Sequence, residues 1–205
     1  MIDLRHVDCM EYLATCEDNA FELAIVDPPY GIGNWVQTTG NVRGKAVEWN
    51  DAKPTKEWFA ELQRVAQRRI IWGSNYYPWI DGNGASIVWN KRMPRESKMS
   101  VCEIASYSEN KRVDYVDVRW QAVNRGEQMI HPCQKPVKLY EWLLINYAKE
   151  GDRILDTHVG SGSSAIACHN LGFDFVGCEI DRDYYNAALK RYRQHAAQLT
   201  IPVAY

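Results

Sequence analysis

The sequence predicts an α/β fold with a mostly parallel sheet. Short apolar strands alternate along the chain with segments of helical periodicity, which is the pattern of strand–helix–strand units. A glycine-rich turn, GSGSS at 160–164, lies between one such strand and the helix that follows it, as in the crossovers of these folds. The length of 205 residues suits one compact core and is short for two, so we expect 1–205 to form a single domain.

The predicted strands are short apolar runs closed by turn residues. FELAIVD at 21–27 is the clearest, because an apolar run leads directly into two prolines. The same pattern predicts strands at 68–75, 85–91, 101–108, 152–156 and 173–181. The alternating stretch 113–120 is interpreted as a further strand or as a covering arm.

The predicted helices have apolar residues at helical spacing and recognisable ends. The segment 54–67 opens with a proline and spaces Trp58, Leu62 and Val65 along one face. The segment 162–172 ends on glycine, a common helix terminator. Two more helices are expected at 135–149 and 183–199. Between strand and helix, 31–53 is rich in Gly, Asn and Thr without a period, so we expect a long, mobile, functional loop.

Composition narrows the class of protein. No apolar run approaches the roughly 18–20 residues of a membrane span, and the N-terminus lacks the pattern of a signal peptide, so we expect a cytoplasmic location. The six cysteines have neither C-x-x-C nor zinc spacing, which predicts reduced thiols and no metal site. The net charge of −2 argues against a wholly basic nucleic-acid coat, so any polyanion site must be a local patch.

The stretch AIVDPPYG, at 24–31, closes a buried strand with a carboxylate, two prolines and a tyrosine. Asp27 and the backbone carbonyl of Pro28 can each accept one N–H of an exocyclic amine on a flat base, which frees the nitrogen lone pair for attack on a sulfonium methyl. Pro28 and Pro29 fix the backbone so that both acceptors stay aimed. Tyr30 offers a face on which the base can stack. The alternative is a simple Asp–Pro strand stop.

A second pattern, ILDTHVGSGSS at 154–164, predicts a cofactor site. Its glycines allow close backbone approach, and the following helix start offers N–H groups to an anion. The next strand ends in Glu179, where an acid is placed to bind ribose hydroxyls. Together these features favour an adenosine-type cofactor. The turn lacks both G-x-G-x-x-G and a P-loop lysine, which disfavours NAD and ATP. A plain crossover with a solvated Glu179 is the alternative.

Seven stretches together resemble amino-methylating DNA methyltransferases of the β class, the bacterial and phage enzymes with permuted motif order. They are HVDCMEYL (6–13), IVDPPYGIG (25–33), IVWNK (87–91), VCEIASYS (101–108), HPCQKPVKLYEWLL (131–144), ILDTHVGSGSSAIAC (154–168) and FVGCEIDRDYYNAALKR (175–191). The resemblance spans nearly the whole chain in the family's order. It implies a Rossmann-like methyltransferase fold with a mostly parallel seven-stranded sheet in circularly permuted order.

The resemblance also implies roles for residues. Asp27, Pro28, Pro29 and Tyr30 correspond to the catalytic motif that holds a flipped target base. Residues implied in binding S-adenosylmethionine are Asp8 beside the adenine, Glu179 at the ribose, Asp27, His158, and Asp156, Gly160 and Gly162 at the methionine end with Lys135 and Pro136 nearby. Glu103 matches the glutamate of the family's strand signature without a role that we assign. His158 lies where the turn departs from the family's D-P-F-x-G-S-G-T pattern; we interpret it as lining the loop rather than as a catalytic base.

DNA contact needs local positive charge, and the segment 91–130 is a short version of the family's target-recognition region. We expect phosphate contacts from seven residues there: Lys91, Arg92, Arg95, Lys98, Arg112, Arg119 and Arg125. Gln121, Asn124 and Arg125 are candidates for contacts with base edges, and a solvated loop is the alternative reading. A region this small predicts a short or relaxed target site.

The resulting hypothesis is an S-adenosylmethionine-dependent enzyme that methylates adenine N6 in double-stranded DNA, in a bacterial or phage-infected cell. Asp27 rather than serine at the motif's first position favours adenine. Two alternatives stay open: the same chemistry on cytosine N4 or on RNA, and a catalytically silent nucleic-acid-binding subunit. The target sequence, a homodimer and an accompanying restriction enzyme also stay open at this point.

Overall fold

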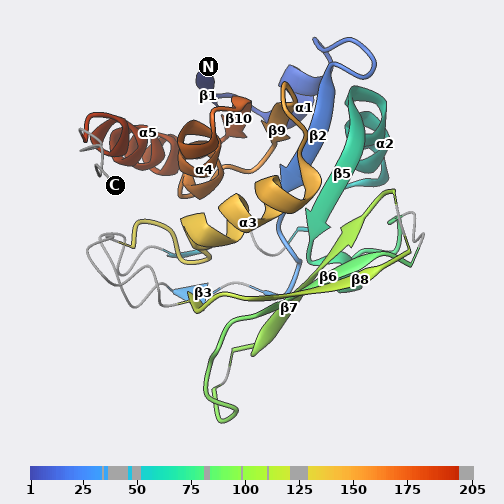
Figure 1. Ribbon diagram of the computed structural model, residues 1–205, viewed down its shortest axis with the longest axis vertical. Helices are drawn as coiled ribbons and strands as arrows, with labels where there is room; N and C mark the ends of the chain where they lie inside the picture. Colours follow the sequence, from blue (N-terminus) through green and yellow to red (C-terminus); the bar gives the residue numbers. More distant parts are fainter. Residues whose placement is uncertain are drawn as a thin grey trace, which may run out of the picture.

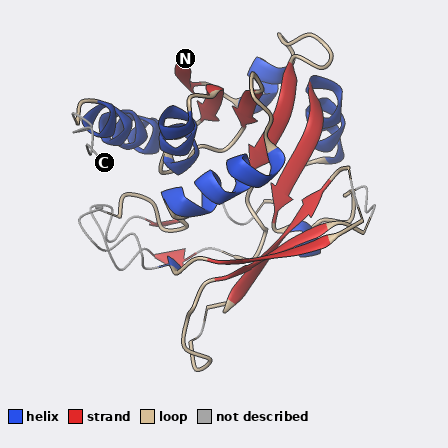
Figure 2. Cartoon of the chain, viewed as in Figure 1, coloured by secondary structure: helices blue, strands red, loops and turns tan. Residues whose placement is uncertain are grey.

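The computed structural model describes residues 1–33, 35–36, 46–47, 52–80, 84–97, 99–109, 111–120 and 129–198. Its centre is an eight-stranded sheet with helices on both faces (Figures 1 and 2). In spatial order the strands are β1 (Ile2–His6), β10 (Asp174–Glu179), β9 (Arg153–Asp156), β2 (Phe21–Val26), β5 (Ala66–Trp72), β7 (Cys102–Tyr107), β6 (Ser86–Asn90) and β8 (Val113–Asp117). Only β7 runs against the others, so the sheet is mostly parallel, as expected.

The helices divide between the two faces according to the alternation of side chains along β2. Leu23 and Ile25 pack in the cluster that includes α3 (Val137–Tyr147) and α4 (Ser163–Leu171). Ala24 and Val26 point the other way, into the cluster with α1 (Cys9–Leu13) and α2 (Lys56–Val65). The last helix, α5 (Arg182–Ala196), lies beside α4 (Figure 1). Both faces of β2 are therefore buried, which is why its sequence is almost continuously apolar.

The connections leave β2 and β9 in opposite directions. From β2 the chain passes through α2 to β5 on one side, and from β9 it passes through α4 to β10 on the other. Because right-handed crossovers in opposite directions cover opposite faces, a crevice opens between the carboxyl ends of β2 and β9. The two motifs singled out in the sequence, 27–30 and 157–164, directly follow these two strands.

The helix ends follow from local side-chain chemistry. Thr55 caps α2 by accepting the Trp58 N–H at 3.4 Å, and Asp181 caps α5 by accepting the N–H groups of Asp183 and Tyr184 at 2.8 and 3.0 Å. Gly162 precedes α4 in the left-handed conformation, with φ +75°.

The structure differs from the sequence-based predictions in the number of strands, decides the nature of 113–120, and describes only part of 31–53. The sheet has eight strands rather than seven, because β1 pairs with β10 at the edge, and neither β1 nor the five-residue helix α1 was predicted. The stretch 113–120 forms a strand, β8. Within 31–53, two short strands pair, β3 (Trp35–Val36) and β4 (Ala46–Val47), and most of the rest lies outside the described residues, so the predicted mobility is not tested.

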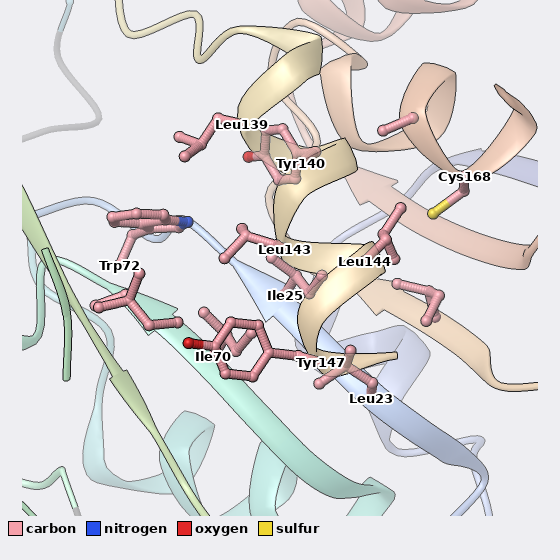
Figure 3. Packing of buried hydrophobic residues seen from close by; sticks show 14 of the residues in the cluster. Leu23, Ile25, Ile70, Trp72, Leu139, Tyr140, Leu143, Leu144, Tyr147 and Cys168 are labelled. Carbon is pink, nitrogen blue, oxygen red and sulfur yellow. The ribbon is translucent and has the colours of Figure 1, made fainter. Parts of the chain in front are cut away.

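The α3 face of the core shows which side chains stabilise the sheet. Figure 3 shows Leu143 and Leu144 of α3 against Ile25 of β2 and Ile70 of β5. Leu143 is completely buried there, whereas Ile145, two residues along the same helix, is 69% exposed.

Leu143→Ala is expected to lower the free energy of unfolding by about 2–5 kcal/mol, because it opens a cavity in this layer. Ile145→Ala is the matched control, with an expected change within about 0.5 kcal/mol. Chemical denaturation of both variants measures the difference. Equal effects would show that α3 does not pack as described.

Candidate active site

A cavity of about 390 Å³ lies at the carboxyl ends of β2, β9 and β10. This volume falls within the roughly 300–1,000 Å³ typical of small-molecule sites. Its lining comes from segments far apart in sequence: Asp27, Pro28, Pro29, Tyr30, Glu103, His131, Cys133, Lys135, Tyr140, His158, Val159, Gly160, Ser161, Glu179, Ile180, Asp181 and Tyr184. The fold thus brings the 27–30 motif, the glycine turn and the acid after β10 to one cavity.

Asp27 has a donor on each carboxylate oxygen. The Tyr30 hydroxyl donates to Oδ1 at 2.7 Å, and the Lys135 ammonium forms an ion pair with Oδ2. Burial raises the pKa of Asp27, and the positive charge of Lys135 acts against that rise. Lys135 is therefore placed beside the predicted catalytic acid.

The backbone acceptor of the motif also has a donor. The Tyr77 hydroxyl donates to the carbonyl oxygens of Pro28 and Pro29 at 2.8 and 3.0 Å. A carbonyl oxygen has two lone pairs, so the Pro28 carbonyl retains capacity for one more N–H. Tyr77 fixes the aim of this peptide, a role that nothing in the sequence pattern indicated.

Tyr30 packs within an aromatic pair. Its ring stacks on Tyr76, with centroids 5.2 Å apart and 19° between the planes. Gly73, at φ +72°, makes room for it, since a Cβ there would lie 2.3 Å from the Tyr30 ring. In this arrangement the Tyr30 hydroxyl, rather than a ligand, hydrogen-bonds Asp27; stacking of a base on the ring stays a prediction.

The glycine turn is braced by the acid that follows β10. The Gly160 N–H donates to Glu179 Oε2 at 2.9 Å, and the Asp181 N–H donates to Oε1 at 2.9 Å. The Gly160 N–H is therefore paired with Glu179 in this structure, and the expectation that the start of the following helix offers N–H groups to an anion stays a prediction. Glu179 still lines the cavity, half-buried, and each of its oxygens can accept a further hydrogen bond from a hydroxyl.

Two predicted cofactor residues support the turn from within instead of lining the cavity. Asp156 is 0% exposed and accepts hydrogen bonds from Ser164 Oγ at 2.6 Å and from the His158 N–H at 3.0 Å. Burial raises the pKa of Asp156 to about 7. Gly162 packs against α5, where a Cβ would lie 3.2 Å from the Ala188 Cβ. In this structure both residues support the 158–161 segment, and their contact with a cofactor stays a prediction.

Two further predicted cofactor residues do not appear among the described residues lining the cavity. Asp8 caps α1 by accepting the Met10 N–H at 2.7 Å, and Pro136 immediately precedes α3. Their contact with a cofactor stays a prediction.

His158 lines the cavity, as expected for its position in the turn. Its Nδ1 lies 2.9 Å from the Thr157 hydroxyl, and its ring meets Trp58 edge-on at 5.7 Å. Burial lowers the pKa of His158 to about 4, so the ring is neutral near pH 7. This neutral, packed ring fits the interpretation that His158 lines the loop.

Several lining residues were not assigned roles from the sequence. His131 belongs to the recognised HPCQKP stretch, and its ring meets Tyr184 edge-on at 4.5 Å. A Cβ on Gly160 would lie 3.4 Å from the same His131 ring, so these segments are in close contact. Cys133 and Tyr140 flank Lys135 along the chain and line the same cavity. The HPCQKP motif was the sequence signal for these residues, and only Lys135 and Pro136 of it were assigned a role.

The basic residues predicted to contact DNA fall into different environments. Lys91 is 4% exposed and pairs with Glu103 at 2.7 Å, so its ammonium is engaged inside the protein, and its contact with a phosphate stays a prediction. The exposed Arg92 pairs with Asp117 at 2.7 Å, and the exposed Arg112 pairs with Asp114. Arg95 and Arg119 are also exposed. The remaining candidates lie outside the described residues: Lys98, Gln121, Asn124 and Arg125.

The described part of the chain contains neither a cluster of metal-ligating side chains nor a membrane-spanning helix. Over those residues, no group of three or more His, Cys, Asp or Glu side chains is arranged to hold a metal ion. None of the described helices is long and apolar enough to cross a membrane.

The chain belongs to the DNA methylase family (N6_N4_Mtase), whose sequence model matches residues 70–190. It is 43% identical over 238 aligned positions to the Type II methyltransferase M2.DpnII of Streptococcus pneumoniae, covering 92% of this chain and 88% of that protein. It is 24% identical over 233 positions to the Type II methyltransferase M.HpaI of Haemophilus parainfluenzae, covering 90% of this chain and 72% of the relative.

Solved structures share the fold. The complex of M1.HpyAVI with S-adenosylmethionine matches with a TM-score of 0.64 and 22% identity, over 93% of this chain and 100% of that one. The PvuII DNA methyltransferase, described as cytosine-N4-specific, matches with a TM-score of 0.58 and 12% identity, over 94% and 89% of the two chains. The chain is therefore an S-adenosylmethionine-dependent DNA amino-methyltransferase, acting on adenine N6 or cytosine N4.

The cavity fits S-adenosylmethionine, which is the cofactor of this class. Glu179 would hold the ribose hydroxyls with its carboxylate oxygens, Gly160 would lie against the cofactor, and Val159, Ile180 and Tyr184 would give it apolar surface. The bound cofactor supplies a methyl group on a positively charged sulfur.

Proposed function

We propose that this protein methylates the N6 amine of an adenine flipped out of double-stranded DNA. The observation that carries the proposal is the juxtaposition of the Asp27 carboxylate and the Pro28 carbonyl at the cavity that also contains Glu179 and the glycine turn. Asp27 rather than serine at the head of the motif supports adenine over cytosine.

Two acceptors can draw the amine toward tetrahedral geometry. Asp27 takes one N–H and the Pro28 carbonyl takes the other, so the lone pair leaves the ring's conjugation and points at the methyl group. A nitrogen–carbon bond forms as the carbon–sulfur bond breaks, and the electron pair of that bond stays on sulfur. The methylated amine then releases its surplus proton along its hydrogen bond to Asp27.

The base and the nucleic acid are identified by one experiment. The protein is incubated with labelled cofactor and mixed-sequence DNA duplexes, single strands or RNA, and the products are digested to nucleosides. Label in N6-methyl-2′-deoxyadenosine from duplex DNA is the expected result. Label in N4-methyl-2′-deoxycytidine, or only in RNA nucleosides, would replace the proposed substrate. No label from a protein that binds cofactor would support the alternative of a catalytically silent binding subunit.

Arg95 and Arg119 are two of the exposed candidates for phosphate contact. Arg95→Gln and Arg119→Gln are each expected to weaken duplex binding and to reduce the salt slope by about one. Lys149→Gln is the matched control, because Lys149 is exposed just before β9 at the opposite end of the strands from the cavity. Fluorescence anisotropy against salt concentration measures all three. Unchanged slopes in both arginine variants would remove these residues from the interface.

The proposal also covers the domain organisation, cellular location and oligomeric state of the protein. We propose one methyltransferase domain over 1–205, with 91–130 as a minimal target-recognition segment, acting in the cytoplasm. A homodimer is a further proposal, which sedimentation of the protein with and without DNA tests directly.

A further inference from the structure

Four charged side chains form a row behind the catalytic motif, and each comes from a different part of the fold. Asp27 follows β2, Lys135 precedes α3, Glu103 lies in β7, and Lys91 follows β6. Lys135 pairs with Asp27 and, at 3.1 Å, with Glu103; Lys91 pairs with the other oxygen of Glu103 at 2.7 Å. The signs therefore alternate along the row, in which Asp27, Lys135 and Glu103 line the cavity.

The row is largely buried. The side chains of Lys135 and Lys91 are 4% and 5% exposed, and those of Asp27 and Glu103 are 15% and 18% exposed. Charges are buried at large cost unless they are paired, so an arrangement with two acids and two bases lets each compensate the next. Loss of one member leaves its neighbour's charge uncompensated.

The resemblance places Lys135 near the methionine end of the cofactor, and the structure shows a different set of contacts. Its ammonium lies between two carboxylates, 3.2 Å from the Tyr30 hydroxyl and 5.4 Å from the centre of the Trp72 ring. A buried lysine surrounded in this way acts on Asp27 directly.

We propose that Lys135 is a positioning residue that keeps Asp27 charged and aimed, and that Glu103, anchored by Lys91, holds Lys135 at the correct distance. This inference rests on the proposed function of Asp27 as acceptor of the target amine. Lys135 alone would bind Asp27 as a closed ion pair and compete with the incoming amine. Glu103 shares the ammonium and leaves Asp27 able to accept the substrate.

The charges act on Asp27 in opposite directions. Burial raises the pKa of Asp27, Lys135 lowers it, and Glu103 raises it. Burial also disfavours a charged Glu103, but Lys135 and Lys91 together hold the pKa of Glu103 at about 2, so Glu103 stays ionised. The other titratable groups that act electrostatically with Asp27 are Tyr30 after the same strand, Tyr77 after β5, Cys133 before α3, Tyr140 in α3 and Asp156 in β9.

Substitutions of the two partners are therefore expected to move activity in opposite directions along the pH axis. Lys135→Met raises the pKa of Asp27, so the acidic limb of the rate profile shifts to higher pH. Glu103→Gln removes a negative neighbour, so the limb shifts to lower pH, and KM for DNA rises because Lys135 closes on Asp27. A shift of one pH unit corresponds to about a tenfold change in rate on that limb. Lys135→Arg keeps the charge and is expected to restore most of the wild-type profile.

A carbon-13 titration of the Asp27 carboxyl, assigned with Asp27→Asn, measures the same effect without turnover. The pKa of Asp27 is expected to be higher in Lys135→Met than in wild type and lower in Glu103→Gln. The cofactor affinity of both variants is expected to change by less than about threefold. Cofactor binding and circular dichroism establish that each variant is folded. If Lys135→Met does not fold, the downward shift in Glu103→Gln tests the inference alone.

The outcomes separate this inference from the proposed function. Coincident Asp27 titrations in wild type and the folded variants would overturn the positioning role, even if wild type methylates DNA adenine. Opposite shifts with a wild type that methylates a different base would support the positioning role and overturn the proposed substrate.

Discussion

Asp27→Asn is expected to reduce methyl transfer by roughly two to three orders of magnitude while changing cofactor affinity by less than about threefold. The substitution keeps the shape of the side chain but replaces one acceptor oxygen by an NH₂ donor, which faces the donor amine of the target. Removal of the negative charge also withdraws the group that stabilises the amine as it becomes positive. Label transfer to DNA measures the rate, and calorimetry measures cofactor binding.

The control for this prediction is Asp18→Asn. Asp18 is an exposed carboxylate that pairs with Arg64 at 2.9 Å, and it does not line the cavity. It is expected to leave both measurements unchanged. Activity of Asp27→Asn equal to that of wild type would contradict the assignment of Asp27 as the acceptor.

Glu179→Ala is expected to weaken cofactor binding by about tenfold to a hundredfold, with most of kcat retained at saturating cofactor. A hydrogen bond to a charged group contributes about 1.5–3 kcal/mol, and tenfold in affinity is about 1.4 kcal/mol. The variant also releases the N–H groups of Gly160 and Asp181, which Glu179 accepts in the structure. Glu150→Ala, at an exposed position before β9, is the matched control.

A cofactor analogue without ribose hydroxyls separates the two actions of Glu179. If Glu179 binds the ribose, removal of the hydroxyls weakens binding to wild type and has little further effect on Glu179→Ala. If Glu179 only braces the turn, the analogue loses the same factor with both proteins. That second result would contradict the assignment of Glu179 as the ribose ligand.

The central strands and the main helices could be predicted from sequence because their patterns are local. β2 is a short apolar run that leads into two prolines, β9 places Ile154 and Leu155 shortly before the glycine turn, and α3 shows helical spacing. β1 was not predicted because IDLRH contains Asp3, Arg5 and His6 among its five residues. The strand also lies at an edge of the sheet and is only partly buried. α1 is too short, at five residues, to show a period.

The site was predictable to the level of motifs, because residues that directly follow parallel strands meet at one edge of the sheet. The environment of individual side chains was not predictable in this way. Lys91 belongs to a basic stretch of sequence, which predicts an exposed residue. The pairing of β6 with β7 places Glu103 beside it, and the two side chains form an ion pair. The sequence predicts Asp156 to be a cofactor-binding residue. Its burial depends on the fold of the following turn, which brings the Ser164 hydroxyl to its carboxylate.

The most direct test of the role of Asp27 is a crystal structure of the protein with a cofactor analogue and duplex DNA that contains the target base. We expect an extruded adenine whose N6 lies about 3 Å from both a carboxylate oxygen of Asp27 and the carbonyl oxygen of Pro28. In that complex the Tyr30 hydroxyl no longer occupies Asp27 Oδ1. An extruded base whose amine is held elsewhere, with Asp27 still bound only to Tyr30 and Lys135, would overturn the assignment of Asp27 as the acceptor of the amine.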